Sequence, residues 1–359
     1  MEEKQSHFRK WIIRVVIFTT LSLFLLAAGL VYWFYTYTET APLVTGKPEK
    51  ILVEVKEGAT FRDVQTQLGE KGLINDDIRF TILARYLKLT HKLKAGEFRL
   101  TQGQKPEALL KELVNAKPVL YSVTIPEGLN LKEVARIFAD KDWCSYDEFI
   151  KLATDKEFIK KLGFDKIDSL EGYLFPDTYL VTRSYRNAEY ALKLMTRKFK
   201  KVWQAAVKDV PKLTLDQHQL ITLASIVEKE AVKPSEQPVI AGVFYNRLAK
   251  NMRLQSDPTV RYGVENRSGP ITRSDLRRKT PYNTYVITGL PPGPICNPGE
   301  GAIRAAVKPA ETEYFYFVSN NDGSHQFSKN LAEHNRAVKK YRKAVRETKR
   351  AAQKGVTSN

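Results

Sequence analysis

The sequence predicts an α+β protein with an N-terminal transmembrane helix, a small β-α region and a larger mixed α+β domain. Three observations support this prediction: a run of twenty uncharged residues near the N-terminus, a strand–turn–helix pattern that occurs twice, and later helices that alternate with Pro/Gly-rich loops. A chain of 359 residues has room for two or three domains. The predicted boundaries are 1–14 for a cytoplasmic N-terminus, 15–37 for the transmembrane anchor, 38–50 for a linker, 51–164 for the repeat-containing region, 165–342 for the larger domain and 343–359 for a basic C-terminal tail.

The uncharged run, residues 15–34, has the length that a helix needs to cross a hydrocarbon core about 30 Å thick. Aromatic residues flank it as in interfacial belts, and four basic residues precede it, which predicts that the N-terminus lies in the cytoplasm. A cleaved signal peptide is the alternative, but the run exceeds the usual core of about 7–15 residues and no Ala-x-Ala site follows. The anchor then places the chain beyond residue 40 on the periplasmic or extracytoplasmic side of the cytoplasmic membrane.

The net charge of +18 favours an anionic neighbour, such as acidic lipid, nucleic acid or an acidic polymer like a cell-wall glycan. Solubility alone is the simpler explanation, and the predicted compartment argues against nucleic acid as a partner. Cys144 and Cys296 lie far apart and outside any CxxC or Cys/His pattern, so one disulfide and two free thiols are both open. A structural metal site is not expected.

An internal repeat relates residues 53–64 to residues 123–134, with an offset of 70 at every matched position. Each copy has alternating apolar residues, a glycine turn, a Thr or Asn cap and the start of a helix. This unit resembles the front half of a LysM-type glycan-binding module, but the same pattern is also common scaffold. Further expected elements are a helix over 76–89, a strand over 94–100, a helical stretch over 146–162, a hairpin over 314–327 with an Asp-Gly turn, and a tail that is a solvated helix or a disordered arm.

A buried helix is predicted between Thr214 and Pro234, with Thr214 and Gln217 as its capping box and Pro234 as its stop. Glu228 and Glu230 near its end lie about 200° apart at 100° per residue, so they cannot form one two-carboxylate site. A carboxyl group held against apolar side chains has a raised pKa and can act as a general acid near neutral pH. Helical geometry alone does not choose between the two glutamates.

The loops after this helix are rich in amides, hydroxyls and aromatic rings, which suits a saccharide-binding cleft. No Gly-x-Ser-x-Gly, Cys/His pairing, P-loop or HExxH occurs, which argues against serine or cysteine hydrolases, P-loop enzymes and zinc hydrolases. Five side chains of these segments are substrate-binding candidates: Gln255, Asp257, Tyr282, Asn283 and Asn246. Of these, Gln255, Tyr282 and Asn283 could equally brace a loop.

Several motifs in a fixed order closely resemble the endolytic murein transglycosylases (the MltG, or YceG-like, family). The matching motifs are residues 224–230, 246–247, 254–259, 282–285 and 289–293, and residues 171–179 also match. The resemblance runs from the anchor to about residue 342. It implies that the second glutamate of Glu-Lys-Glu, here Glu230, is the catalytic residue. The long basic tail is less typical of the family, so the resemblance implies nothing for it.

The resemblance also implies a reaction. Glu230 would protonate the oxygen of the β-1,4 bond between N-acetylmuramic acid and N-acetylglucosamine, and would then help the muramoyl 6-hydroxyl attack C1 to leave a 1,6-anhydro end. One carboxylate can serve both steps, because the intramolecular hydroxyl replaces water. The implied partners are peptidoglycan glycan strands, the membrane and cell-wall synthases beside which the enzyme terminates nascent strands, with no cofactor and no metal.

Two other interpretations stay open. The first is ordinary glycoside hydrolysis, with Asp257, Asp177 or Glu171 as the partner of Glu230. The second is a non-catalytic scaffold, in which the repeat binds the wall and Glu230 is structural.

Overall fold

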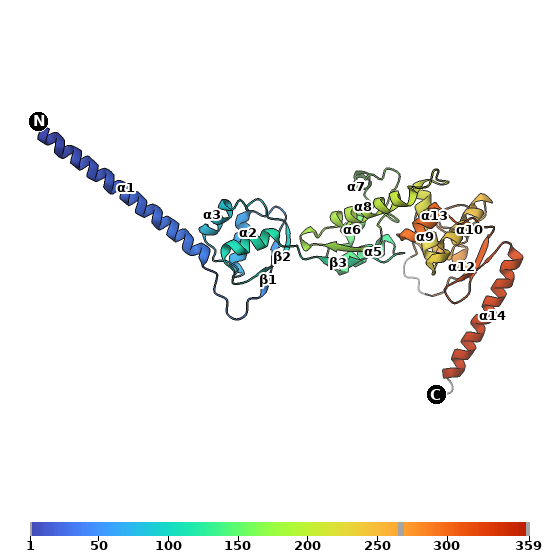
Figure 1. Ribbon diagram of the computed structural model, residues 1–359. Helices are drawn as coiled ribbons and strands as arrows, with labels where there is room; N and C mark the ends of the chain where they lie inside the picture. The colour runs from blue at the N-terminus through green and yellow to red at the C-terminus, as the bar shows by residue number, and fades with distance from the viewer. Residues whose placement is uncertain (1, 265–268, 357–359) are drawn as a thin grey trace. The chain divides into compact units, whose positions relative to one another are not determined.

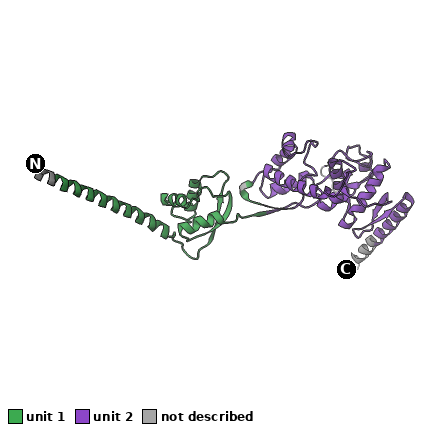
Figure 2. Ribbon diagram, turned by 45° about the horizontal axis from the view of Figure 1, so that its top comes forward, with its two compact units in different colours: residues 1–121, 181–185 green, residues 122–180, 186–359 purple. Residues whose placement is uncertain are grey.

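The structure is a computed structural model that describes residues 2–264 and 269–356. It contains two compact units: residues 1–121 with 181–185, and residues 122–180 with 186–359 (Figure 2). This division does not follow the predicted boundary after residue 164, because the second copy of the repeat belongs to the second unit. Its strand β3 (Tyr121–Thr124) pairs with β4 (Thr178–Val181), and its helix α5 (Leu131–Asp140) packs on α6 (Tyr146–Ala153).

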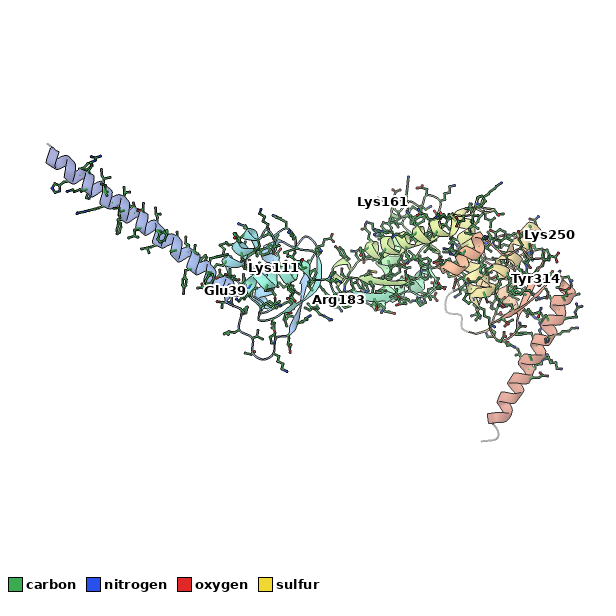
Figure 3. All side chains as sticks on the ribbon, in the orientation of Figure 1. Glu39, Lys111, Lys161, Arg183, Lys250 and Tyr314 are labelled. Atoms are coloured by element: carbon green, nitrogen blue, oxygen red, sulfur yellow. The ribbon has the colours of Figure 1, made fainter. Side chains whose placement is uncertain are left out.

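The first unit begins with α1 (Glu2–Glu39), which extends the predicted span at both ends. Within α1, residues His7–Glu39 form the one helical segment of the described residues that is long and apolar enough to cross a membrane. A signal sequence would meet the same criteria of length and composition. The side chains along this span lie exposed around the helix (Figure 3). Only its last turns pack on other elements: Tyr37 is buried and donates to the carbonyl oxygen of Asn75 at 3.0 Å, and the Arg79 guanidinium lies 4.8 Å from the Tyr37 ring centre.

The remainder of the first unit is a small antiparallel sheet covered by helices. Strand β1 (Lys50–Val55) pairs with β2 (Gly96–Thr101), so that Val53 faces Phe98 in the register. The helices are α2 (Phe61–Glu70), α3 (Ile78–Tyr86) and α4 (Pro106–Asn115). Apolar side chains from all of these elements form one buried core, which confirms the predicted helix over 76–89 and the predicted strand over 94–100.

The strand–turn–cap–helix pattern of the repeat is confirmed in both copies. Gly58 and Gly128 each have φ +78°, a left-handed conformation that glycine adopts without a steric cost. Thr60 caps α2 and Asn130 caps α5, each through a capping box with the acidic residue three positions later. The two copies therefore share their local chemistry, although they belong to different units.

The second unit is mainly helical (Figure 1). The predicted helical stretch over 146–162 is divided into α6 and α7 (Lys156–Lys161), because Asp155 caps the second helix. Helix α9 (Gln217–Glu230) packs against α10 (Gln237–Ala249) and α13 (Glu300–Val307). The other elements are α8 (Ala188–Val207), the short α11 (Asp257–Arg261) and α12 (Arg273–Leu276), and the 3-10 turns η1 (Arg183–Tyr185, in the first unit) and η2 (Pro234–Glu236).

The C-terminal part contains the predicted hairpin. Strands β5 (Tyr316–Ser319) and β6 (His325–Ser328) pair antiparallel, and α14 (Leu331–Val356) packs against both. The basic tail is thus helical through Val356 and continuous with the domain. Cys144 and Cys296 are both free thiols, the first half-buried and the second buried, which decides between the two alternatives left open by the sequence.

Candidate active site

Helix α9 positions the predicted acid. It begins two residues later than predicted, because Asp216 and Gln219 form the capping box in place of Thr214 and Gln217: each side chain accepts the backbone N–H of the other, at 2.9 and 3.0 Å. The helix ends at Glu230, before the predicted stop at Pro234. Its eight residues 220–227 are buried, as the apolar pattern predicts.

The two glutamates at the end of α9 face different partners, which confirms that they do not form one site. The Glu228 carboxylate accepts the backbone N–H of Gly299 at 3.2 Å, and burial raises its pKa. The Glu230 carboxylate accepts the hydroxyl of Ser256 at 2.6 Å. Lys229, between them, donates to the carbonyl oxygen of Gly128.

The environment of Glu230 suits a group that both gives and takes a proton. The residue is half-buried, and burial of its carboxyl raises the pKa to about 7. The Ser256 hydroxyl, the Asp257 backbone N–H and the charge of Arg247 lower this pKa, while the charge of Asp257 raises it. Near neutral pH the protonated and ionised forms are therefore both populated, as efficient general acid–base catalysis requires.

Ser256, which the sequence reasoning missed, is fixed by the loop around it. It is 1% exposed, and its backbone N–H donates to the Thr284 hydroxyl at 2.9 Å. The neighbouring Gln255 N–H donates to the Thr284 carbonyl oxygen at 3.1 Å, and Thr259 donates to the Ser256 carbonyl oxygen at 2.6 Å. Hydrogen bonds between segments 254–259 and 282–285 therefore fix the position of Ser256 beside the Glu230 carboxyl. The only sequence signal was that Ser256 stands between two residues already selected.

Three of the predicted binding residues lie on these two segments with part of their surface open to solvent. Gln255 is exposed and has φ +48°. Asp257 is exposed, and its carboxylate accepts the hydroxyl of Tyr285 at 2.7 Å. Tyr282 is half-buried against Tyr262, with 4.6 Å between the ring centres. These three side chains remain the substrate-binding candidates, and two of them, Gln255 and Asp257, flank the Ser256 that contacts Glu230.

The other two predicted binding residues brace loops with their amides. Asn246 donates to the carbonyl oxygens of Thr312 and Tyr314 at 2.7 and 2.9 Å, which ties α10 to the segment before β5. Asn283 is buried; its amide nitrogen donates to three carbonyl oxygens of residues 275–278, and its oxygen accepts the N–H of Tyr285. For both residues the structure favours the loop-bracing alternative.

The other carboxyls considered as partners of Glu230 have contacts elsewhere. Asp177 forms an ion pair with Lys198 at 2.8 Å, and this hydrogen bond holds its pKa below the usual value. Glu171 is buried; both of its oxygens lie 3.0 Å from the N–H of Leu131, and Tyr262 donates to one of them. Burial raises the pKa of Glu171 to about 7.

Asn297 contacts three loops of the second unit, and sequence reasoning did not single it out. It is fully buried, and its side-chain oxygen accepts the N–H groups of Gly172 and Leu174 at 3.0 and 2.9 Å. Its side-chain nitrogen donates to the Leu129 carbonyl oxygen at 2.9 Å. The loop before α5, the loop 171–177 and the loop 289–299 therefore meet at one amide. Gly172, with φ +86°, packs so closely that a Cβ there would lie 2.5 Å from Pro294.

Comparison with known proteins agrees with this architecture. Residues 53–340 match the YceG-like family. An endolytic murein transglycosylase of Bacillus subtilis is 32% identical over 84% of this chain and 87% of its own length. A protein of the same name from Streptococcus pneumoniae is 30% identical over 93% of this chain, which spans 65% of that longer relative. The crystal structure of a YceG-like protein from Listeria monocytogenes superposes with a TM-score of 0.55, at 36% identity over 80% of this chain and 98% of that one.

Proposed function

The chain belongs to the YceG-like family, and on this premise we propose that it is a lytic transglycosylase that cleaves the glycan strands of peptidoglycan, with Glu230 as acid and base. Its curated relatives are named endolytic murein transglycosylases. The single observation that carries the residue assignment is the Glu230 carboxyl, which accepts the Ser256 hydroxyl and has a pKa raised to about 7. A polar, half-open site around one such carboxyl suits cleavage of an uncharged glycosidic bond.

In the first step, protonated Glu230 gives its proton to O4, the oxygen that links C1 of N-acetylmuramic acid to C4 of N-acetylglucosamine. The C1–O4 bond breaks, and the N-acetylglucosamine residue leaves with a 4-hydroxyl group. In the second step, the muramoyl 6-hydroxyl attacks C1 and loses its proton to the Glu230 carboxylate. This closes the 1,6-anhydro ring and restores the acid, and it requires no water.

Ser256 and the exposed groups around it support both steps. The Ser256 hydroxyl and the Asp257 N–H donate to the carboxylate form, which limits the rise in pKa that burial causes. Gln255, Asp257 and Tyr282 offer an amide, a carboxylate and an aromatic hydroxyl to the sugar hydroxyls and acetamido groups.

The N-terminal helix would anchor the enzyme beside its substrate. The uncharged segment of α1 crosses the membrane once, the basic residues before it stay in the cytoplasm, and the remainder lies on the outer side. The repeat units would act as LysM-like glycan contacts. Placed at the membrane, the enzyme would cut nascent strands beside cell-wall synthases and so terminate their elongation.

The product decides between this reaction and hydrolysis. Purified peptidoglycan digested with the full chain should yield fragments that end in 1,6-anhydro-N-acetylmuramic acid, identified by mass spectrometry. Fragments with reducing ends instead would identify the protein as a glycoside hydrolase. If no glycan is cut, the wall-binding scaffold becomes the better interpretation.

The pH dependence should report the Glu230 carboxyl. Because the free enzyme must hold a proton on Glu230, kcat/KM should be highest below pH 7 and fall as the pH rises through about 7. Replacing Ser256 with alanine removes a donor that lowers the pKa, so the falling limb should move to higher pH. A profile measured on soluble glycan strands tests this, and a limb that moves to lower pH would contradict the assignment.

A further inference from the structure

Glu171 is a buried carboxyl that the proposed chemistry does not use. It is 7% exposed and lies at the start of the loop before β4. Its oxygens accept the N–H of Leu131, the first residue of α5, and the hydroxyl of Tyr262 at 3.0 Å. Taking a carboxyl out of water is costly unless its hydrogen bonds are made, so this group has a positional role.

The short helix α11 connects Glu171 to the site of Glu230. Ser256, which donates to Glu230, is the N-cap of α11, and Tyr262, which donates to Glu171, is its C-cap. Five helical residues span only about 7.5 Å. The Glu230 and Glu171 carboxyls therefore each accept a hydrogen bond from one end of the same short helix.

The Tyr262 ring supports the ring of Tyr282. Their centres are 4.6 Å apart and their planes are tilted by 48°. Tyr282 is half-buried, so part of its surface is open to solvent, and its hydroxyl lies beside Gly293, where a Cβ would come within 3.4 Å. A fixed aromatic ring with a polar edge fits the C–H face and hydroxyls of a sugar.

We propose that Glu171 is a positioning residue that acts through Tyr262 to hold Tyr282 as a sugar-binding surface at the end of α11 opposite Ser256. The ligand is a pyranose ring of the same glycan strand that Glu230 cuts, so this inference rests on the proposed function. Glu171 and Tyr262 orient the ring, and Tyr282 contacts the sugar. The expected signature is weaker glycan binding with an unchanged chemical step.

Two variants interrupt the connection at different points. Glu171→Gln removes the charge, and Tyr262→Phe removes only the hydroxyl that donates to it. For the full chain in detergent, Tyr262→Phe should raise KM about three- to tenfold, as expected for a lost hydrogen bond of about 0.5–1.5 kcal/mol. Glu171→Gln should raise KM by a smaller factor, because its amide oxygen still accepts the Tyr262 hydroxyl without the charge that strengthens this bond. The value of kcat should stay within about twofold. In a Tyr282→Ala background, Glu171→Gln should have no further effect on KM, because its target is gone.

Asp168→Asn is the matched control. Asp168 lies three residues before Glu171, its side chain is 82% exposed, and the substitution makes the same chemical change. It should leave KM and kcat unchanged. A fall in kcat with unchanged KM for Glu171→Gln and Tyr262→Phe, or full additivity with Tyr282→Ala, would overturn the proposal.

A binding measurement separates this proposal from the proposed function. In a Glu230→Gln background, the dissociation constant for uncut glycan strands should rise by the same factor on adding Tyr262→Phe. If Glu230→Gln still cuts glycan at the wild-type rate, the proposed function fails. If that variant is inactive but Tyr262→Phe leaves both binding and KM unchanged, only the role of Glu171 fails.

Discussion

Replacing Glu230 with glutamine is expected to lower kcat for glycan cleavage by about 10²–10⁴-fold, the usual contribution of general acid–base catalysis. The amide has nearly the same shape and can still accept the Ser256 hydroxyl, but it cannot give a proton to the glycosidic oxygen. KM should change little, because the variant keeps the surrounding contacts. The rate of release of anhydro-ended fragments from purified peptidoglycan measures the effect.

Glu228→Gln is the matched control for this prediction. The two glutamates lie two residues apart on α9, and burial raises the pKa of both carboxyls. Glu228, however, accepts the N–H of Gly299 at the start of α13, away from Ser256. Its replacement should keep kcat within about threefold of the wild-type value. Equal losses in both variants would mean that the helix end needs charge or stability, and not an acid at residue 230.

Replacing Asn297 with alanine is expected to be the most destabilising single change at the site. It leaves two buried backbone N–H groups, of Gly172 and Leu174, without their acceptor, whereas the carbonyl oxygen of Leu129 keeps the backbone N–H of residue 297. Each of the two unpaired groups costs about 1–3 kcal/mol, so the free energy of unfolding should fall by about 2–6 kcal/mol. This should lower the Tm of the second unit on the order of 10 °C. Thermal unfolding followed by circular dichroism measures the shift.

Asn320→Ala provides the comparison for Asn297. Asn320 is exposed and its amide donates only to the Ser324 hydroxyl within the β5–β6 turn. The Asn320→Ala substitution should lower the free energy of unfolding by no more than about 0.5 kcal/mol. Similar Tm values for the two variants would show that water replaces the lost contacts of Asn297, so that the three loops do not depend on this amide.

The parts of the fold that depend on local pattern were predictable from the sequence. Apolar periodicity indicated α9, and the repeat indicated the caps at Thr60 and Asn130, because a cap is decided by residues only three positions apart. The start of α9 was placed two residues too early, since Thr214 and Asp216 offer the same cap pattern to different partners. The prediction that Glu228 and Glu230 do not form one site also holds, because their separation follows from helix geometry alone.

The contacts that make the site were not predictable in the same way. Ser256 reaches Glu230 across 26 residues of sequence, and Asn297 reaches Gly172 across 125. Such pairs depend on how distant loops pack, which periodicity does not encode. The same limit explains the amides of Asn246 and Asn283: sequence showed polar groups in loops, but not that backbone carbonyls already occupy them.

Glu230 is the last residue of α9, and this position also affects how readily its carboxyl ionises. Peptide dipoles leave partial negative charge at the C-terminal end of a helix, where a carboxylate is disfavoured and a neutral acid is not. The backbone of α9 therefore opposes ionisation, whereas the Ser256 hydroxyl favours it. The helix terminus therefore adds to burial in favouring the proton, while the Ser256 hydroxyl and the Asp257 N–H favour its loss, and a single substitution in the 254–259 loop can retune the pH at which the enzyme works.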